Sequence, residues 1–310
     1  MAQLIDPLVL VLPGYEQLGS QLARTLGAQV GEVERQIFPD GERYQRVVTP
    51  VADRDVLIVG GTVDDVSTLT LFDLACAVAK YGARRLDLVI PYFGYSTMER
   101  AVKPREVITA KTRARLLSAI PIAAIGNRAW FVDLHSEGIP HYCEGGLVAR
   151  HIYAKPAILP VLRKLGGKDM VLASTDAGRA KWVQSLGIEL GCEVAIIIKR
   201  RVSGSETAVS AVSCEVAGRH VVIYDDMIRT GGSLLGAARC YRDAGATAVD
   251  VVATHGVFPG DAFARLQAAP EIDRIACSDS HPRAVALADD GLQLIPLAGV
   301  IAERIADGGP

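Results

Sequence analysis

The sequence predicts an α/β protein built from two duplicated domains, each with a mostly parallel sheet flanked by helices. Short apolar runs rich in β-branched residues alternate with longer amphipathic stretches along the 310 residues. This alternation is typical of repeated strand–helix–strand units. The two halves of the chain also share a sequence pattern at a constant spacing, which indicates an internal repeat. A chain of this length favours two domains, or one large one.

The expected strands are short apolar runs, and most of them are separated by stretches with apolar residues at helical spacing. Because helices that connect parallel strands cover both faces of a sheet, the strands are expected to be buried. The expected strands are residues 8–13, 55–60, 86–92, 129–134, 170–174, 194–199, 220–225 and 249–255.

The repeat relates positions that differ by 163 in residue number. It aligns Gly82 with Gly245 and Asp87 with Asp250, and the simplest explanation is a duplicated domain. The alternative is chance, since any two strand–helix units resemble each other. Pro156 and Pro160 lie near the middle of the chain and indicate a domain boundary there. The expected domains are residues 1–148, completed by residues 297–310, and residues 149–296.

Composition excludes several classes of function. The formal net charge is −2, which argues against nucleic acid or an anionic membrane as the main partner. The six cysteines form no CxxC pair or zinc pattern, and they are expected to be reduced. The N-terminus lacks the pattern of a signal peptide, and no apolar segment is long enough to span a membrane. We therefore expect a cytoplasmic protein.

The most informative segment is HVVIYDDMIRTGGS, which starts at His220. Its first half predicts a strand, and Thr-Gly-Gly-Ser predicts the start of a helix, where backbone N–H groups and the helix dipole can bind an anion. Asp225 and Asp226 would lie at the carboxyl end of the strand, where open α/β sheets bind ligands. Such a site suits a ribose phosphate. The acids would accept hydrogen bonds from the ribose hydroxyls or help to hold Mg²⁺. Ordinary capping acids are the alternative.

Other polar residues also follow expected strands. Asp133 and His135 can hold a cation, although a core histidine with satisfied hydrogen bonds is an equal alternative. Asp176 precedes a helix, and its residue type alone favours an N-cap. Lys199 and Arg201 precede a Ser-Gly-Ser loop and could cover a polyphosphate. The alternative for these two cations is a solvated strand end.

Together, these segments resemble the ribose-phosphate pyrophosphokinase family over nearly the whole chain. The similarity lies in FPDGE, IPYFGY, ITAK, DLH, TDAG, KRR, DDMIRTGGS and THGVF, in this order and at these spacings. It implies two phosphoribosyltransferase-like domains and an enzyme that transfers the pyrophosphoryl group of ATP to the 1-hydroxyl of ribose 5-phosphate. The products would be phosphoribosyl pyrophosphate and AMP. The resemblance also implies Mg²⁺ and a homo-oligomer, dimer-based or hexameric, whose adenine site is shared between subunits.

The resemblance also implies a role for each matched residue. Lys199 and Arg201 would stabilise the transferring group, and His135 and Asp176 would position Mg²⁺ on the ATP phosphates. The implied ATP site comprises Phe38, Asp40, Gly41, Glu42, Thr97, Met98, Glu99 and Arg100. The implied ribose 5-phosphate site comprises Asp225, Asp226, Arg229, Thr230, Gly231, Gly232 and Ser233.

Some positions depart from the common pattern of this family. Thr97 stands where the common bacterial and animal enzymes have an arginine, and the Thr-x-Glu-Arg pattern that it begins resembles the plant-type (class II) enzymes. Arg229 replaces a usual acid, and Arg179 replaces a usual small residue. These departures concern the triphosphate contacts, the nucleotide preference and the allosteric control more than the fold.

Two other functions are compatible with parts of the sequence. A phosphoribosyltransferase would use the same ribose-phosphate loop, but it would have a single such domain and would lack the KRR and FPDGE segments. A catalytically weak regulatory paralogue would bind nucleotides within an assembly. Its catalytic residues would be lost, whereas Lys199, Arg201 and His135 are present here.

Overall fold

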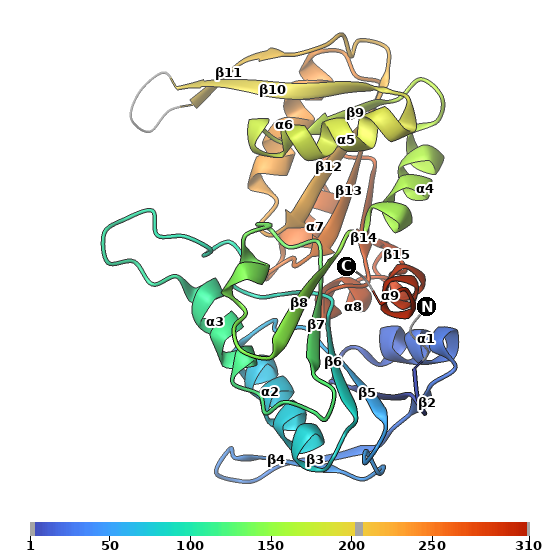
Figure 1. Cartoon of the computed structure of the whole chain (residues 1–310). Coiled ribbons are helices and arrows are strands. Elements are labelled where there is room, and N and C mark those ends of the chain that lie inside the picture. Colours follow the sequence, from blue (N-terminus) through green and yellow to red (C-terminus); the bar gives the residue numbers. More distant parts are fainter. Residues whose placement is uncertain (1–3, 202–206, 309–310) are drawn as a thin grey trace. The chain divides into compact units, whose positions relative to one another are not determined.

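The computed structural model describes residues 4–201 and 207–308. The chain divides into two compact units, each with a parallel sheet and flanking helices (Figure 1). Unit 1 comprises Met1–Tyr153 and Leu297–Pro310, and unit 2 comprises Ala154–Pro296. A division after residue 148, as expected from the sequence, would fall inside a strand, because β8 (Leu147–Ile152) continues the sheet of unit 1.

The sheet of unit 1 has the strand order β2-β1-β5-β6-β7-β8, and every neighbouring pair is parallel. Its central strands are fully buried, as expected for a sheet covered on both faces. In addition to β8, its strands are β1 (Leu8–Val11), β2 (Gln29–Val30), β5 (Asp55–Val59), β6 (Arg85–Ile90) and β7 (Asn127–Val132).

The helices of unit 1 lie against this sheet, and the last helix of the chain packs on the first. They are α1 (Glu16–Leu26), α2 (Asp65–Lys80), α3 (Thr109–Ser118), the 3₁₀ turn η1 (Ile139–Tyr142) and α9 (Ala298–Ala306). A separate antiparallel hairpin consists of β3 (Val33–Ile37) and β4 (Arg43–Val47). The C-terminal segment therefore completes the first unit.

The sheet of unit 2 has the order β11-β10-β9-β12-β13-β14-β15, and only the β10–β11 pair is antiparallel. Its strands are β9 (Val171–Ser174), β10 (Glu193–Arg201), β11 (Thr207–Val212), β12 (His220–Ile228), β13 (Ala248–Gly256), β14 (Arg274–Ser278) and β15 (Gln293–Ile295). Its helices are α4 (Lys155–Gly166), η2 (Ala177–Arg179), α5 (Ala180–Leu190), α6 (Gly232–Asp243), α7 (Ala262–Gln267) and α8 (Pro282–Ala286).

The two units repeat one plan, as the sequence pattern predicted. The order β1-β5-β6-β7-β8 in unit 1 corresponds to β9-β12-β13-β14-β15 in unit 2. Gly82 and Gly245, the aligned glycines after α2 and α6, have φ values of 87° and 93°. Glycine adopts this left-handed conformation at little cost, so it is the natural end of both helices.

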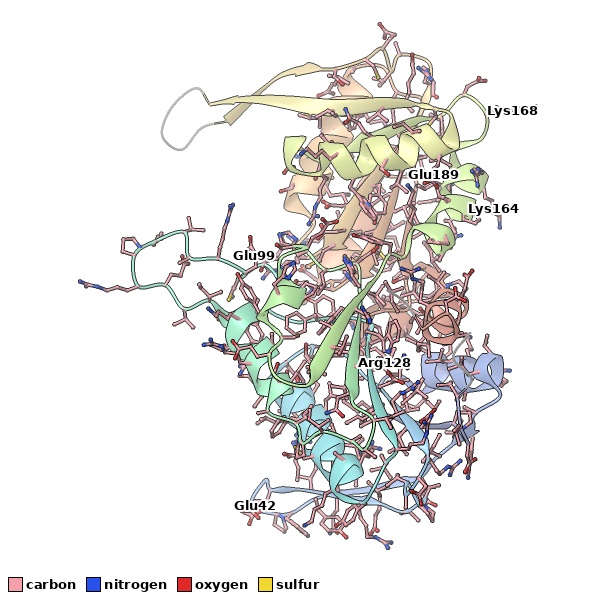
Figure 2. The ribbon with its side chains drawn as sticks, in the orientation of Figure 1. Glu42, Glu99, Arg128, Lys164, Lys168 and Glu189 are labelled. Carbon is pink, nitrogen blue, oxygen red and sulfur yellow. The ribbon has the colours of Figure 1, made fainter. Side chains whose placement is uncertain are left out.

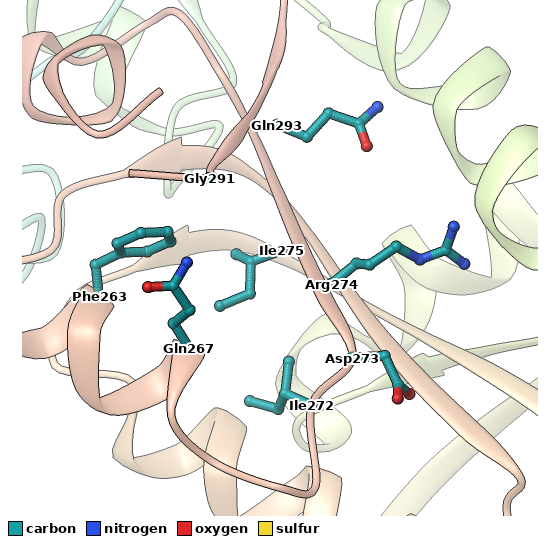
Figure 3. A pocket seen from close by; sticks show the side chains of 8 residues that line it. All are labelled: Phe263, Gln267, Ile272, Asp273, Arg274, Ile275, Gly291 and Gln293. Atoms are coloured by element: carbon teal, nitrogen blue, oxygen red, sulfur yellow. The ribbon is translucent and has the colours of Figure 1, made fainter. Parts of the chain in front are cut away.

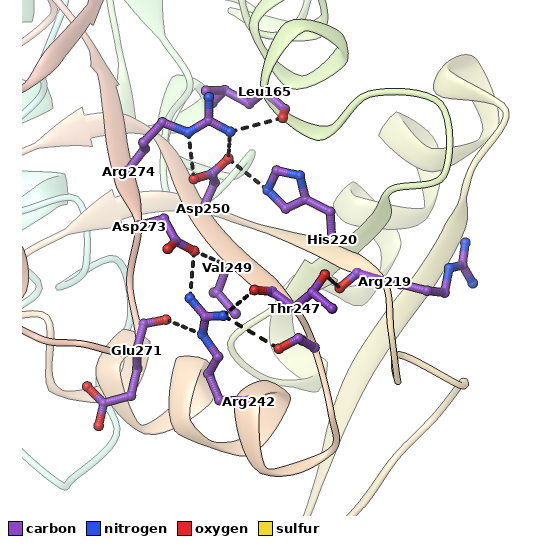
Figure 4. Close-up of polar contacts among 11 residues, drawn as sticks. Leu165, Arg219, His220, Arg242, Thr247, Val249, Asp250, Glu271, Asp273 and Arg274 are labelled. Carbon is purple, nitrogen blue, oxygen red and sulfur yellow. Dashed lines mark hydrogen bonds and ion pairs between the residues drawn. The ribbon is translucent and has the colours of Figure 1, made fainter.

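An ion pair with a buried carboxylate also occurs at the same place in both units. Asp87 on β6 accepts two hydrogen bonds from Arg128 on β7, at 2.6 and 2.7 Å. Asp250 on β13 accepts two from Arg274 on β14, at 3.0 and 2.6 Å (Figure 4). Both carboxylates are fully buried, so the fork of the guanidinium is needed to compensate their loss of water.

Each expected strand corresponds to an observed one, but short strands at the sheet edges were not predicted. These include β2, β8 and β15, which are too short or too polar to stand out as apolar runs. Within the described residues, no helix is long and apolar enough to cross a membrane.

Candidate active site

The two adjacent acids lie inside β12. The sequence placed them at the end of a strand over residues 220–225, but β12 continues to Ile228. Pairing with β9 ends at Ile223, and beyond that residue β12 pairs only with β13. Asp225 and Asp226 therefore lie just past the carboxyl end of β9, which is where a ligand can approach the sheet.

The loop after β9 contacts both acids. The hydroxyl of Thr175 donates to Asp225 Oδ2 at 3.1 Å, and the guanidinium of Arg179 forms an ion pair with Asp226. The backbone N–H of Asp226 also donates to Asp225 Oδ1 at 2.9 Å. Burial, together with the hydrogen bond and the negative charge of Asp226, raises the pKa of Asp225 to about 7.

An anion site follows β12 at the start of α6. Gly231 has φ 77°, and a Cβ atom there would lie 2.6 Å from the side chain of Leu266. Glycine is thus required for the turn that aims the first N–H groups of α6 outward. Around it, the exposed residues are Arg229, Thr230, Gly232 and Ser233. The first turn of α6 carries no acidic residue, so its positive end is available to a phosphate.

Asp176 has the capping geometry that its residue type predicted. Its Oδ1 accepts a hydrogen bond from the N–H of Gly178 at 2.8 Å, which stabilises the turn before α5. The side chain is partly exposed. A carboxylate oxygen has more than one lone pair, so this hydrogen bond leaves capacity to bind a cation.

Lys199 and Arg201 lie on β10, which pairs with β11 opposite Val209 and Thr207. The register shifts between Ile198 and Lys199, so the strand is irregular where the cations begin. Figure 1 shows this pair of strands extending beyond the rest of the sheet of unit 2. The side chains of these two residues, and all of the following Ser203–Ser205 loop, lie outside the described residues.

In unit 1, Thr97, Met98, Glu99 and Arg100 follow β6 in an ordered loop. Tyr95 has φ 60°, and its hydroxyl donates to Asp65 at 2.9 Å. The Tyr142 hydroxyl donates to the carbonyl oxygen of Glu99 at 2.6 Å. Thr97, Met98 and Arg100 are exposed, so their side chains are accessible to a ligand.

His135 follows the neighbouring strand β7. It is partly buried, and it stands two residues after Asp133, a buried residue with φ 36°. Because β6 and β7 are adjacent and parallel, His135 and the loop of Thr97 belong to the same edge of the sheet of unit 1. A strained backbone of this kind is maintained only when the surrounding structure requires it, and it is common at functional sites.

The third predicted segment of unit 1, residues 38–42, forms the tip of the β3–β4 hairpin. Phe38 N–H donates to the carbonyl of Glu42 at 2.8 Å, and Gly41 has φ 93°. Phe38, Asp40, Gly41 and Glu42 are exposed. Figure 2 shows Glu42 and Glu99 at opposite ends of unit 1. One chain therefore does not place the hairpin tip beside the Thr97–Arg100 loop.

The structure adds contacts that the sequence did not reveal. Thr175 was not predicted as a site residue, and Arg179 was noted only as a departure from a family pattern. The signal that could have identified Thr175 was its place directly before Asp176 in the TDAG segment. Nothing in the sequence indicated that Arg179 would contact Asp226, because the two residues are 47 positions apart.

A pocket of about 230 Å³ lies elsewhere in unit 2, at the amino end of β14 (Figure 3). Two polar side chains at its lining are already hydrogen-bonded: Gln267 donates to the carbonyl of Asp290, and Arg274 to Asp250. The pocket is separate from the acids of β12, which lie toward the other end of the parallel strands.

The residues fit a magnesium ion that is bound mainly by substrate. Among residues 4–201 and 207–308, no group of three His, Cys, Asp or Glu side chains could hold a metal by itself. Mg²⁺ does not require such a group, because it commonly takes one or two carboxylates and completes its shell with substrate phosphates and water. Within unit 2, Asp176 supplies a suitable oxygen. His135 belongs to unit 1, where it follows β7.

Comparison with known proteins reveals consistent similarity. The family model described as the N-terminal domain of ribose phosphate pyrophosphokinase matches residues 8–120, and a phosphoribosyl synthetase-associated domain matches residues 190–307. The ribose-phosphate pyrophosphokinase of Fusobacterium nucleatum is 31% identical over 93% of this chain and 90% of its own length. That of Rhodopirellula baltica is 33% identical over the same shares.

A solved structure is similar over both units. The phosphoribosylpyrophosphate synthetase of Mycobacterium smegmatis superposes with a TM-score of 0.84 and 25% sequence identity. The superposition covers 98% of this chain and 100% of that one. The similarity therefore extends over both units of this chain.

Proposed function

The chain belongs to the ribose-phosphate pyrophosphokinase family, and we infer that it transfers the pyrophosphoryl group of ATP to the 1-hydroxyl of ribose 5-phosphate. The products are phosphoribosyl pyrophosphate and AMP. The observation that carries this function is the arrangement in unit 2, where Asp225 and Asp226 stand between the loop of Asp176 and the glycine turn of α6. This arrangement suits a sugar phosphate.

Ribose 5-phosphate binds to unit 2. Its phosphate takes the N–H groups at the start of α6, with Thr230 and Ser233 as further donors. Asp225 accepts hydrogen bonds from ribose hydroxyls, since both of its oxygens keep lone pairs after the contacts to Thr175 and the Asp226 N–H. These contacts fix the sugar, so that its 1-hydroxyl is held in one orientation.

In the reaction, the 1-hydroxyl oxygen forms a bond to the β-phosphorus of ATP, the bond from that phosphorus to the oxygen shared with the α-phosphate breaks, and the hydroxyl proton is lost. Lys199 and Arg201 on β10 meet the negative charge that develops on the transferring group. Asp176 and His135 are the residues that would hold Mg²⁺, and the bound ion would supply positive charge to the phosphates. No covalent enzyme intermediate is needed.

The ATP site combines Thr97, Met98, Glu99 and Arg100 with the hairpin tip of Phe38, Asp40, Gly41 and Glu42 of a neighbouring subunit. The separation of Glu42 and Glu99 within one chain supports this sharing. The protein is therefore a homo-oligomer, with a dimer as the minimal unit. The cytoplasmic location stays a prediction from the sequence.

The direct test is the release of AMP from ATP in the presence of ribose 5-phosphate. AMP and phosphoribosyl pyrophosphate should appear in equal amounts and only when both substrates are present. A regulatory paralogue would bind ATP without forming AMP. A phosphoribosyltransferase would instead consume phosphoribosyl pyrophosphate when a nucleobase is supplied. Either result would contradict the proposal.

Regulation is proposed to follow the plant-type pattern, which Thr97, Glu99 and Arg100 resemble. Threonine lacks the fork that an arginine would offer to a phosphate, so the triphosphate depends on other groups. We expect substantial activity in phosphate-free buffer, shallow ADP inhibition that ATP relieves, and measurable use of other purine triphosphates. Strict phosphate dependence with sigmoidal ADP inhibition would place the chain with the common enzymes instead.

A further inference from the structure

The ion pair between Arg179 and Asp226 connects the loop after β9 to the acids of β12. The two side chains are 23% and 10% exposed. Exposed ion pairs contribute little to stability, because water screens them and both side chains lose freedom. This pair is largely shielded, and therefore removing one partner would leave a poorly solvated charge.

The acids of β12 need a counter-charge. Two adjacent carboxylates repel each other when both are ionised, and burial makes the repulsion stronger. A divalent cation or a protein cation can relieve it. In this chain the guanidinium of Arg179 already lies on Asp226, and the Thr175 hydroxyl donates to Asp225. One five-residue loop, residues 175–179, thus contacts each acid through one side chain.

We propose that Arg179 is a positioning residue that acts as the resident counter-cation of the Asp225–Asp226 pair, so that ribose 5-phosphate binds without a divalent cation at these acids. The guanidinium holds Asp226 in place and offsets its negative charge. Asp225 then remains the acceptor for ribose hydroxyls. Arginine stays charged at every physiological pH, so this counter-charge is permanent, whereas a bound metal ion depends on its concentration. The inference rests on the proposed function, which supplies the sugar phosphate.

The test is calorimetric titration of ribose 5-phosphate into the full-length protein, without ATP. It is done once in EDTA and once with excess Mg²⁺. Wild-type affinity should differ by less than about threefold between the two media. Arg179→Ala should bind at least about tenfold more weakly in EDTA, because the acids lose the positive charge beside them, and Mg²⁺ should restore most of the loss. Arg179→Lys, which keeps the charge, should retain most of the metal-independent binding.

The control is Arg242→Ala. Arg242 has the same exposed fraction, 23%, and it also forms an ion pair, with Asp273. Figure 4 shows this pair beside Val249, near the start of β13. Asp225 is paired with Ala253, farther along the same strand. Replacement of Arg242 should leave the dependence of ribose 5-phosphate binding on Mg²⁺ unchanged. Should Arg179→Ala fail to fold, Arg179→Gln gives the same comparison, since it keeps the size of the side chain and removes the charge.

Two outcomes would overturn the inference. One is wild-type binding that requires Mg²⁺, and the other is Arg179→Ala binding that is equal to wild type in EDTA. Neither affects the proposed function, which AMP release on the same preparation tests separately. Absence of ribose 5-phosphate binding by the wild type in both media, together with absence of AMP release, would mean that the function itself is wrong.

Discussion

At the scale of single residues, the proposed role of Lys199 is to meet negative charge as it develops on the transferring group. Lys199 stands on β10 where the strand register becomes irregular, next to the loop that follows the strand. We expect Lys199→Ala to keep the fold and nucleotide binding but to lose turnover by about 10²- to 10³-fold, the usual effect of removing one preorganised donor. Turnover measured at saturating substrates tests this.

Lys168→Ala is the matched control for Lys199→Ala. Lys168 is an exposed lysine in the same unit, outside the proposed site (Figure 2). Its replacement should leave turnover at the wild-type value. Near-normal turnover of Lys199→Ala would show that another group stabilises the transferred phosphoryl charge.

Asp225 gives a prediction about pH. Burial and the nearby Asp226 raise its pKa to about 7, whereas an unfolded chain keeps the ordinary value. Between about pH 4 and pH 7 the folded state binds the extra proton, so this group's contribution to stability falls as the pH rises. Because the ionised carboxylate is the stronger acceptor for ribose hydroxyls, ribose 5-phosphate affinity should rise with pH through about 7.

Asp225→Asn separates this titration from that of the ligand. A phosphate monoester itself loses its second proton near pH 6, at about the value expected from phosphorylated side chains. The affinity of wild type and of Asp225→Asn for ribose 5-phosphate is measured by calorimetry from about pH 5.5 to pH 8. The difference between the two affinities should therefore show the titration of the Asp225 carboxylate alone. The variant should also lose affinity for ribose 5-phosphate far more than for ATP. Parallel pH profiles would contradict the assignment.

At the scale of elements, the turn between β12 and α6 is the proposed binding position of the ribose phosphate. Gly231→Ala would force an alanine into a left-handed conformation and press its Cβ against Leu266. Strain and overpacking together should cost roughly 2 kcal/mol or more. We expect a lower unfolding temperature and weaker ribose 5-phosphate binding, measured by calorimetric unfolding and titration.

Gly232→Ala is the comparison for this turn. A Cβ atom added at Gly232 would have no atom within 4 Å, and Gly232 does not have a left-handed φ. Alanine there should be tolerated, and it reduces the freedom of the unfolded chain. Equal losses of stability in the two variants would mean that the conformation of Gly231 is not what the turn requires.

The predictability of the elements follows from the same physics. Buried parallel strands such as β5 and β13 can be recognised in the sequence as apolar runs, because both faces of the sheet are covered. The edge strand β8 has the polar sequence LVARHI and was not predicted. The extension of β12 to Ile228 was missed because a strand that contains two acids does not resemble a buried one.

The site was predictable only in part. Motif residues such as Asp225 and Gly231 were identified from their local pattern, since a strand, a glycine turn and a helix follow each other directly. The partner of Arg179 was not identified, because the loop after β9 lies close to Asp226 only when β9 and β12 pair in the sheet. Contacts of this kind depend on strand order, which a single sequence does not specify.

At the scale of the whole molecule, the shared ATP site can be tested by mixing variants. Phe38→Ala removes an aromatic side chain from the hairpin tip, and Lys199→Ala removes a cation from unit 2. Each variant alone should be nearly inactive. In co-expressed oligomers, random pairing should give about one quarter of sites an intact hairpin from one chain and an intact Lys199 from the other.

The measurement is AMP release by the co-expressed protein, compared with the sum of the two separate variants. Analytical ultracentrifugation of each variant shows whether the assembly is intact. Activity no higher than the sum would mean that the hairpin serves the site of its own chain.

The buried carboxylates of Asp87 and Asp250 have a consequence for how a duplicated chain assembles correctly. Their remaining partners differ: the indole N–H of Trp130 donates to Asp87, and the ring of His220 bonds to Asp250. A strand that inserted into the wrong half during folding would keep the general strand pattern but lose one of these partners. The carboxylate would then be buried with an unmet hydrogen bond, at a cost of roughly 1–3 kcal/mol. An exchange of strands that removes one of these partners is therefore disfavoured.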